Sequence, residues 1–311
     1  MRIIFMGTPE FAVASLKALT ERNYHVVAVV TMPDKPAGRG HKLQYSAVKQ
    51  FALSCGIPVL QPLKLKDESF LAELRSYNAD FQIVVAFRML PEVVWNMPPL
   101  GTFNLHASLL PQYRGAAPIN WAIMNGEKET GVTTFFLTHE IDTGKIICQE
   151  KIAISDDDNA GILHDKLMLI GSELVCKTVD KVTSGNIKPL DQSQMIEENT
   201  TLKLAPKIFK EDCRLRFDIP VQKAHNFVRG LSPQPTAWTY LQFPTMNEPA
   251  QFKIFCTEPE IVAHNEDPGN LLTDGKTYAK IAMPDGFIKL ISIQPADRKR
   301  MSVGDFLRGL R

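Results

Sequence analysis

Apolar residues in the first part of the chain form short runs separated by stretches with helical spacing. Runs of buried-strand length lie at Ile3–Met6, His25–Thr31, Pro58–Leu60, Asp80–Phe87 and Thr102–His106. Runs that are apolar on both faces are typical of parallel strands covered by helices. The stretches between them predict helices at Glu10–Leu19, Ser46–Cys55, Glu68–Ser76 and Ala116–Met124. This alternation predicts an α/β fold built on a doubly wound, mostly parallel sheet.

The pattern changes further along the chain. Thr133–Leu137 and Lys145–Ile154 predict two strands around a loop, and Ile162–Thr183 predicts a long helix. Helical spacing is then lost, so we expect a first domain at 1–189, a linker at 190–207 and a second domain at 208–311. The second domain shows one helical stretch and several short strands, at Val221–Leu231, Trp238–Phe243, Gln251–Thr257, Tyr278–Met283 and Phe287–Ile293. Short strands separated by Asp-Gly turns predict a small antiparallel barrel.

Composition narrows the class of protein. The 311 residues are 44% hydrophobic and 22% charged, which is ordinary for a soluble globular chain, and the net charge of +1 provides no overall attraction for a polyanion. The five cysteines are scattered without a Cys-x-x-Cys pair, which favours a reducing compartment, argues against disulfides or a zinc site, and predicts buried thiols. No apolar run has the length of a membrane span, and Met1–Gly7 is too short for a signal peptide. We therefore expect a cytoplasmic protein without a membrane partner.

The turn after the first strand does not predict a dinucleotide site. A doubly wound fold that binds such a cofactor carries Gly-x-Gly-x-x-Gly at this point. Only Gly7 is present here, and Pro9 and Glu10 oppose a pyrophosphate cradle. The fold class alone therefore does not predict a nucleotide.

Two polar residues stand out at the end of the Thr102–His106 strand. Asn104 and His106 are two positions apart, so their side chains share one face. A single histidine on a strand is most often a hydrogen-bonded core residue. Here an amide accompanies it, and a loop rich in Pro and Gly follows, at the edge where open α/β sheets hold ligands. This combination favours a functional site.

Two other loops carry possible chemistry. Asp142 lies in the loop Thr138–Gly144, where Asp and Gly are usually turn residues. The functional alternative is that this loop brings a carboxylate to His106. The loop Pro33–Leu43 holds Arg39 and Lys42 among prolines and glycines. It is either a solvated surface loop or a phosphate-backbone contact through these two cations.

The segment Asn104-Leu105-His106-x-Ser108-Leu109-Leu110-Pro111-x-Tyr113-Arg114-Gly115 resembles the motif of the folate-dependent formyltransferase family, and Asp142-Thr143-Gly144 matches its downstream aspartate. The resemblance covers nearly the whole chain. It implies a Rossmann-like first domain, an OB-like second domain and 10-formyltetrahydrofolate as formyl donor, without a metal. It also implies that Asn104, His106 and Asp142 are catalytic.

The resemblance further implies binding residues. The folate site would be walled by Ser108, Leu109, Leu110 and Pro111 on one side and by Phe87, Arg88, Met89 and Leu90 on the other. The loop with Arg39 and Lys42 resembles one in those family members that formylate methionine on initiator tRNA, where the arginine contacts the acceptor end. From this we expect a monomeric enzyme of translation initiation whose second domain binds tRNA.

Some positions depart from the family pattern, and other functions stay open. The family usually has Tyr-Gly in place of Phe87-Arg88 and Gly in place of Glu140, and His139 is also atypical. One rival interpretation is a formyltransferase for a small amine, such as glycinamide ribonucleotide or an amino sugar, or a formyl-folate hydrolase. Another is a non-catalytic module that binds tRNA or a nucleotide. The Pro33–Lys42 loop and the second domain argue against the first rival, and the intact Asn, His and Asp against the second.

Overall fold

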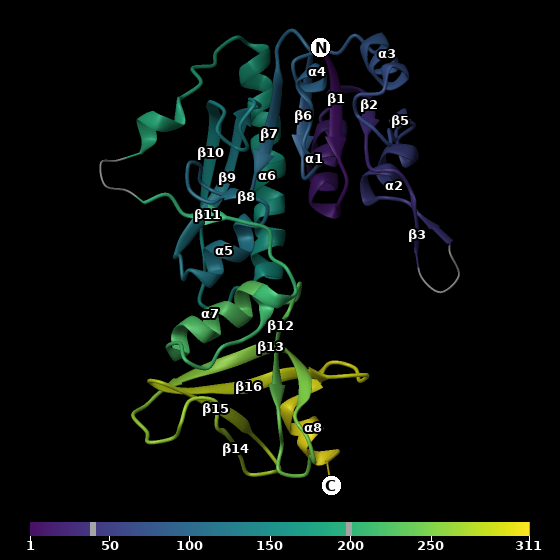
Figure 1. Ribbon diagram of the computed structural model, residues 1–311. Helices are drawn as coiled ribbons and strands as arrows, with labels where there is room; N and C mark the ends of the chain where they lie inside the picture. Colours follow the sequence, from purple (N-terminus) through teal and green to yellow (C-terminus); the bar gives the residue numbers. More distant parts are fainter. Residues whose placement is uncertain (38–41, 197–200, 311) are drawn as a thin grey trace. The chain divides into compact units, whose positions relative to one another are not determined.

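The computed structural model describes residues 1–37, 42–196 and 201–310 (Figure 1). The chain packs into two compact units. The first consists of Met1–Gly115, Thr130–Ile152 and His164–Leu204, and the second of Ala116–Glu129, Ala153–Leu163 and Ala205–Arg311. The chain therefore passes between the units several times. The domain limits predicted above remain a prediction.

A seven-stranded sheet forms the centre of the first unit. Its strand order is β10-β9-β7-β6-β1-β2-β5. The strands are β1 (Arg2–Gly7), β2 (His25–Val30), β5 (Val59–Leu60), β6 (Phe81–Val85), β7 (Thr102–His106), β9 (Glu129–Phe136) and β10 (Ile146–Ala153). The pairs β1/β2, β1/β6, β2/β5 and β6/β7 are parallel, whereas β7/β9 is antiparallel. The sheet therefore changes from parallel to antiparallel pairing at β7.

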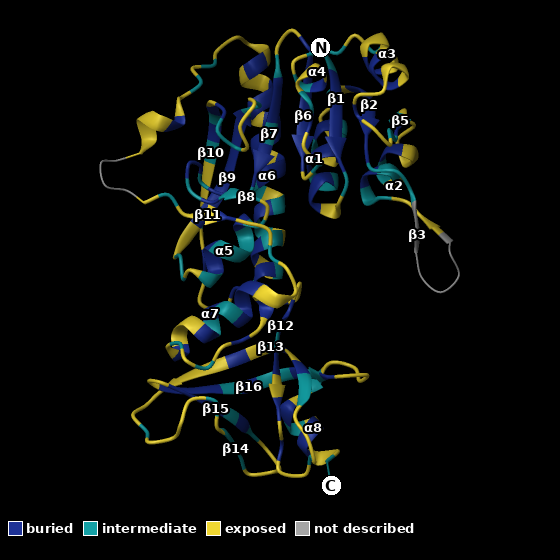
Figure 2. Cartoon of the chain, viewed as in Figure 1, coloured by how far each residue is buried: buried dark blue, intermediate teal, exposed yellow. Residues whose placement is uncertain are grey.

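Helices cover both faces of this sheet. On one face, α3 (Glu68–Ser76) and α4 (Glu92–Trp95) pack their apolar residues against β1, β2 and β6. On the other face, α6 (Ala160–Thr183) passes over β7, and Gly171 allows it to lie directly on Leu105. Helix α1 (Glu10–Glu21) lies beside α6, since Arg22, just past its end, bonds Glu173. Figure 2 shows β1, β2, β6 and β7 almost entirely buried between these layers, whereas β10 at the edge of the sheet is mostly half-buried or exposed.

The remaining elements of the first unit are short. They are α2 (Ala47–Ser54), the hairpin strands β3 (Lys35–Ala37) and β4 (Lys42–Gln44), β8 (Arg114–Gly115) and the 3-10 turn η1 (Gln192–Met195). Helix α2 has a sequence-encoded start, because the Ser46 side chain accepts a hydrogen bond from the Lys49 N–H. β11 (Leu204–Ala205) lies where the chain leaves the unit. Both η1 and β11 fall in the segment that the sequence predicts as a linker.

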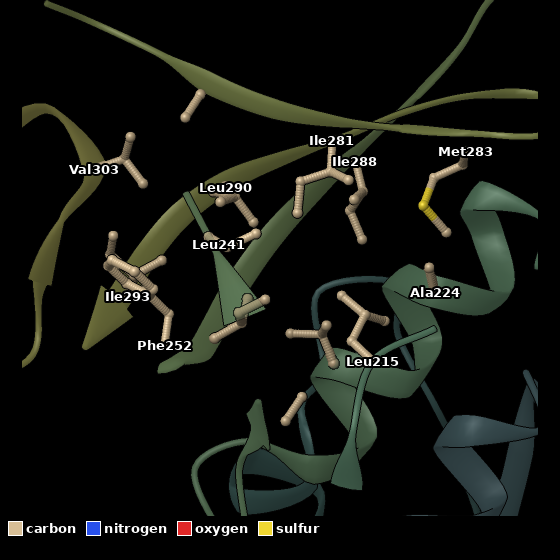
Figure 3. Close-up of a cluster of buried hydrophobic side chains, with 14 of the residues drawn as sticks. Leu215, Ala224, Leu241, Phe252, Ile281, Met283, Ile288, Leu290, Ile293 and Val303 are labelled. Atoms are coloured by element: carbon tan, nitrogen blue, oxygen red, sulfur yellow. The ribbon is translucent and has the colours of Figure 1, made fainter. Parts of the chain in front are cut away.

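The second unit is built on an antiparallel sheet. The strand order is β12-β13-β16-β15-β14, and β17 pairs with β16. The strands are β12 (Ala237–Leu241), β13 (Ala250–Ile261), β14 (Leu271–Thr273), β15 (Ala279–Met283), β16 (Gly286–Pro295) and β17 (Met301–Ser302). With them are α5 (Pro118–Met124), η2 (Glu211–Cys213), α7 (Val221–Leu231) and α8 (Val303–Arg308). Figure 3 shows aliphatic side chains from this sheet and from α7 meeting in one core, with Leu290, Ile288 and Ala224 among them.

The predicted fold class is therefore confirmed: a doubly wound, mostly parallel sheet is followed by an antiparallel β domain. The prediction of buried cysteines is wrong for two of the five. Cys148, Cys176 and Cys213 are buried and all five are free, but Cys55, which follows the last residue of α2, and Cys256, within β13, are exposed. Among the described helices, none is both long and apolar enough to cross a membrane.

One buried arginine explains why Ala153–Leu163 packs with the second unit. Arg229 on α7 is 8% exposed. Its guanidinium donates hydrogen bonds to the carbonyls of Ser155 and Asp158, at 3.1 and 2.9 Å, and to the Asn226 side chain at 2.9 Å. Burial lowers the pKa of this guanidinium from its ordinary value. The charge is tolerated because several oxygens surround it.

We expect Arg229→Met to destabilise the second unit by about 2 kcal/mol or more, because it leaves buried carbonyls without a donor. Urea unfolding followed by tryptophan fluorescence measures the effect. Arg216→Met is the matched control, because Arg216 lies in the same unit but is largely exposed. Equal shifts of the unfolding midpoint in the two variants would contradict this account of Arg229.

Candidate active site

The two polar residues predicted from the sequence lie on β7, where the sheet changes direction. In the register of the sheet, Asn104 lies between Val84 of β6 and Phe135 of β9. His106 lies beside Thr133 and is buried, whereas Asn104 is half-buried. Because α6 covers Leu105 on the opposite face, Asn104 and His106 both point away from that helix. Within the described residues, the Asn104 amide forms no hydrogen bond, so it remains available as a donor.

The His106 ring is held at both nitrogens. Its Nε2 lies 2.8 Å from the carbonyl oxygen of Tyr113. A carbonyl can only accept, so Nε2 carries the proton of this bond. The other nitrogen, Nδ1, faces the Asp142 carboxylate at 3.7 Å, and the two side chains are 7% and 13% exposed. The structure thus brings the predicted histidine and aspartate together.

Asp142 reaches His106 through a turn that runs back along the sheet. Because β9 is antiparallel, its last residue, Phe136, pairs with Phe103 near the start of β7. The loop after it reverses through Asp142, whose φ is 56°, in the left-handed region. Gly144 follows, at a point where an added Cβ would lie 1.6 Å from the Phe136 carbonyl oxygen. Only glycine fits there, so this residue permits the close return.

The Asp142 carboxylate has a second partner. The Gly115 N–H donates to Oδ2 at 2.9 Å, so the oxygen that faces His106 is also held by the main chain. Gly115 has a φ of 126°, which places its N–H in a position that few other residues could adopt. A carboxylate fixed in this way can orient the imidazole.

The Ser108–Pro111 loop, predicted to wall the folate site, is hydrogen-bonded by side chains of two strands, β9 and β10. The hydroxyl of Thr133 donates to the Ser108 carbonyl at 2.6 Å and accepts from the Leu110 N–H at 3.2 Å. The Gln149 amide of β10 donates to that hydroxyl and to the Leu110 carbonyl, at 2.9 and 2.8 Å. Ser108 donates its own hydroxyl to the Gln112 carbonyl. Much of the loop main chain is therefore already bonded within the protein. Leu109 and Pro111 complete this predicted wall.

The second predicted wall leaves β6, the parallel neighbour of β7, at the same edge of the sheet. Phe87 is half-buried, Leu90 is buried and Met89 is 72% exposed. Arg88 turns its guanidinium away to the preceding loop, where it donates to the carbonyls of Leu63 and Pro62 at 3.0 and 2.5 Å. Burial lowers its pKa from the ordinary value. Arg88 therefore ties two loops together, a task that the usual glycine could not perform.

The basic loop is described only in part. Arg39 lies outside the described residues, and Lys42 is placed in β4 by its main chain alone. The base of the hairpin is firmly held, because Lys49 donates to both Asp34 and Gln61, at 2.5 and 2.7 Å. His139, the atypical residue before Glu140, is exposed and lies against Trp95 and Glu92, away from His106.

Sequence reasoning missed three residues that hold the site together: Thr133, Gln149 and Gln192. Thr133 and Gln149 lie on predicted strands, but a strand pattern does not show which polar residue faces the loop. Gln192 lies in the predicted linker, yet it is 2% exposed. The only feature of the sequence that could have indicated a buried, bonded side chain here is the glutamine beside the turn-forming Asp191. Within the described residues, no cluster of side chains suited to a metal ion occurs.

Comparison with known proteins places this fold and site in a family. The family model described as formyl transferase matches residues 1–179, and the model described as formyl transferase, C-terminal domain, matches residues 207–311. The chain therefore belongs to the formyl transferase family. Asn104, His106 and Asp142 all lie within the first of these two matched regions.

Individual relatives are similar over the full length. The chain is 58% identical to the methionyl-tRNA formyltransferase of Bacteroides thetaiotaomicron, over 100% of this chain and 96% of the relative. It is 53% identical to that of Flavobacterium johnsoniae, over 100% and 96%. Among solved structures, HypX from Aquifex aeolicus in complex with tetrahydrofolic acid aligns with a TM-score of 0.65 at 20% identity, over 100% of this chain and 47% of that one. The sugar 3N-formyl transferase WlaRD aligns with a TM-score of 0.65 at 22% identity, over 96% and 99%. The last two similarities concern the fold.

We expect Thr133→Val to loosen the 108–112 loop, because it removes the hydroxyl that three groups share while keeping the shape of the side chain. A loss of about 2 kcal/mol in unfolding free energy should accompany faster hydrogen exchange at the Leu110 amide. The control is Thr134→Val, because that neighbouring buried hydroxyl bonds Thr178 of α6 and does not contact the loop. Unchanged exchange at Leu110 in Thr133→Val would refute this tether.

Proposed function

We infer that this enzyme transfers the formyl group of 10-formyltetrahydrofolate to the α-amino group of methionine esterified to initiator tRNA, giving the formylated tRNA that starts translation. One observation carries the inference: the full-length identity of 58% to a methionyl-tRNA formyltransferase. The meeting of an amide, an imidazole and a carboxylate on one edge of the first unit supports it, because formyl transfer to an amine needs an oxyanion donor and a group that moves protons. We further propose that the enzyme acts in the cytoplasm and as a monomer.

The residues of the site have distinct tasks in this reaction. The folate supplies a formyl carbon that an amine can attack. Asn104 is the donor for the oxygen that becomes negative during the attack, because its amide is uncharged and uncommitted. His106 helps to move a proton. The attacking amine loses this proton, and the folate nitrogen that releases the formyl group gains it. Asp142 holds the ring in position through Nδ1.

The present geometry sets a condition on His106. Its Nε2–H is bonded to the Tyr113 carbonyl and its Nδ1 faces Asp142, so the ring serves a reacting atom by releasing the Tyr113 carbonyl. The Asn104 amide, in contrast, forms no hydrogen bond among the described residues. The amide is therefore the donor that is ready before the substrate arrives.

The binding sites fit the same reaction. The Phe87–Leu90 and Ser108–Pro111 loops follow neighbouring parallel strands and form the two walls of the folate site. Arg39 and Lys42 bind the tRNA backbone, since guanidinium and ammonium groups beside glycines can approach phosphates closely. The alternative is a small amine or water as acceptor. The full-length similarity to the tRNA-specific relatives weighs against it.

We expect Asn104→Ala and Asp142→Asn to fold normally and to lose about 10²–10³-fold in turnover, because each removes one group that acts on the reacting atoms or on His106. The assay supplies labelled formyl donor with charged initiator tRNA, with free amines and with water. Only the tRNA should acquire label with the unaltered enzyme. Near-normal turnover in either variant would remove that residue from the mechanism, and label on the free amine would favour the alternative function.

The second unit offers a surface suited to nucleic acid. Trp238 and Tyr240 point outward from β12, and the Arg214 guanidinium lies 5.8 and 6.0 Å from their ring centres. The Trp238 indole N–H donates to the Lys210 carbonyl at 2.7 Å, which fixes this ring. Lys253 pairs with Trp238 across the sheet and is exposed. Cations interleaved with aromatic rings can bind phosphates and stack on bases. We assign tRNA binding by the second unit to this surface.

We expect Lys253→Glu to weaken tRNA binding and to reduce the slope of log affinity against log salt by about one, because one phosphate contact is lost. The control is Lys276→Glu, the same charge change at an exposed turn of the same unit. Filter binding at several salt concentrations measures both variants. Identical curves for the two would show that the β12 surface is not the tRNA site.

A further inference from the structure

We propose that Gln192 is a positioning residue for catalysis, which holds the Asp142 carboxylate in place opposite His106. The inference rests on the proposed function. It starts from the place of Gln192 in the fold: η1, a short turn far along the chain from the catalytic motif. The side chain is 2% exposed, although its neighbours Asp191 and Ser193 are both exposed. A buried amide in an otherwise exposed turn points to a specific set of partners.

Those partners use the whole hydrogen-bonding capacity of the amide. The Nε2 group donates to the carbonyl of Asp142 at 2.8 Å and to that of Gly144 at 2.8 Å. The Oε1 atom accepts from Nε and Nη2 of Arg114, at 3.0 and 2.6 Å. An amide has two N–H donors and an oxygen with two acceptor positions. All four are occupied, so the side chain is fixed from both ends.

The two ends belong to the two loops that form the catalytic contact. Asp142 and Gly144 belong to the turn that returns along the sheet, whereas Arg114 precedes Gly115, whose N–H bonds the Asp142 carboxylate. Gln192 therefore braces the bond between Gly115 and Asp142 from both sides. Asp142 has a φ of 56°, which a non-glycine residue keeps only when its surroundings hold it. The amide of Gln192 supplies that hold.

The main chain around Gln192 is itself anchored. Leu190 exchanges two backbone hydrogen bonds with Ile146, the first residue of β10, at 2.8 and 2.9 Å. Asp191 caps the turn by accepting from the N–H and hydroxyl of Ser193. The amide is thus presented by a rigid support, which a positioning residue requires.

Glutamine is the only common side chain of this length that can serve both loops. Glutamate can still accept from Arg114, but it cannot donate to the carbonyls of Asp142 and Gly144, and it would face them with negative charge. Gln192→Glu therefore cuts the brace on the Asp142 side alone. Since small displacements of a catalytic group have large effects on rate, we expect kcat to fall roughly 10- to 100-fold. The KM for the folate should change less than twofold, because Gln192 contacts neither predicted wall.

The matched control is Gln194→Glu, the same change at an exposed position of the same turn. It should leave kcat, KM and the melting temperature unchanged. If Gln192→Glu also retains full activity while Asp142→Asn is impaired, the positioning role is wrong and the proposed function stands. If Asp142→Asn is itself fully active, the failure lies in the catalytic assignment on which this inference depends.

A double-variant comparison separates positioning from a general structural role. Gln192→Met, which removes both sets of bonds without adding charge, is combined with Asp142→Asn. If Gln192 acts through the Asp142 carboxylate, the double variant should have nearly the kcat of Asp142→Asn alone. Losses that multiply in the double variant would overturn the proposal. A circular dichroism melt of each variant identifies any that fail to fold, and Gln192→Glu then provides the test.

Discussion

The return of the Asp142 carboxylate to the His106 ring is the contact on which the site depends. It requires a turn in which Asp142 adopts the left-handed region, a conformation that costs a non-glycine residue about 1 kcal/mol or more. The turn also needs a glycine pressed against a carbonyl oxygen. Three hydrogen bonds oppose this cost, one from Gly115 and two from Gln192, each contributing about 1 kcal/mol. These bonds hold the turn in the shape that brings Asp142 to His106.

The position of β7 in the sheet explains why the groups meet there. Its parallel neighbour, β6, ends at the same edge and supplies the Phe87–Leu90 loop. Its antiparallel neighbour, β9, passes alongside and supplies Thr133, which pins the loop after His106. A wholly parallel sheet would provide only loops at that edge. The change of direction adds side chains that support the loop from beside it.

The sequence predicted the main elements of the fold, and it indicated Asn104, His106 and Asp142 as candidate reacting groups. Apolar runs bounded by Gly and Pro marked the strands, and the spacing of Asn104 and His106 placed their side chains on one face. What it could not show were contacts between segments far apart in the chain. Gln192 falls in the predicted linker. Its burial depends on the pairing of Leu190 with Ile146, a contact that the local sequence does not show. In the same way, the polar character of Arg88 gave no sign that it would bond the carbonyls of Pro62 and Leu63.

The anchoring of η1 has a practical consequence for work with parts of this chain. A fragment that ended at residue 189, where helical spacing stops, would contain Asn104, His106 and Asp142. It would lack Leu190, which pairs with Ile146. It would also lack the Gln192 amide, which joins the Asp142 turn to Arg114. Such a fragment would carry the three proposed catalytic residues without the hydrogen bonds by which Gln192 holds the Asp142 turn. The contact between Asp142 and His106 therefore gains its full support only after ribosomal synthesis has passed Gln192, well beyond both residues in the sequence.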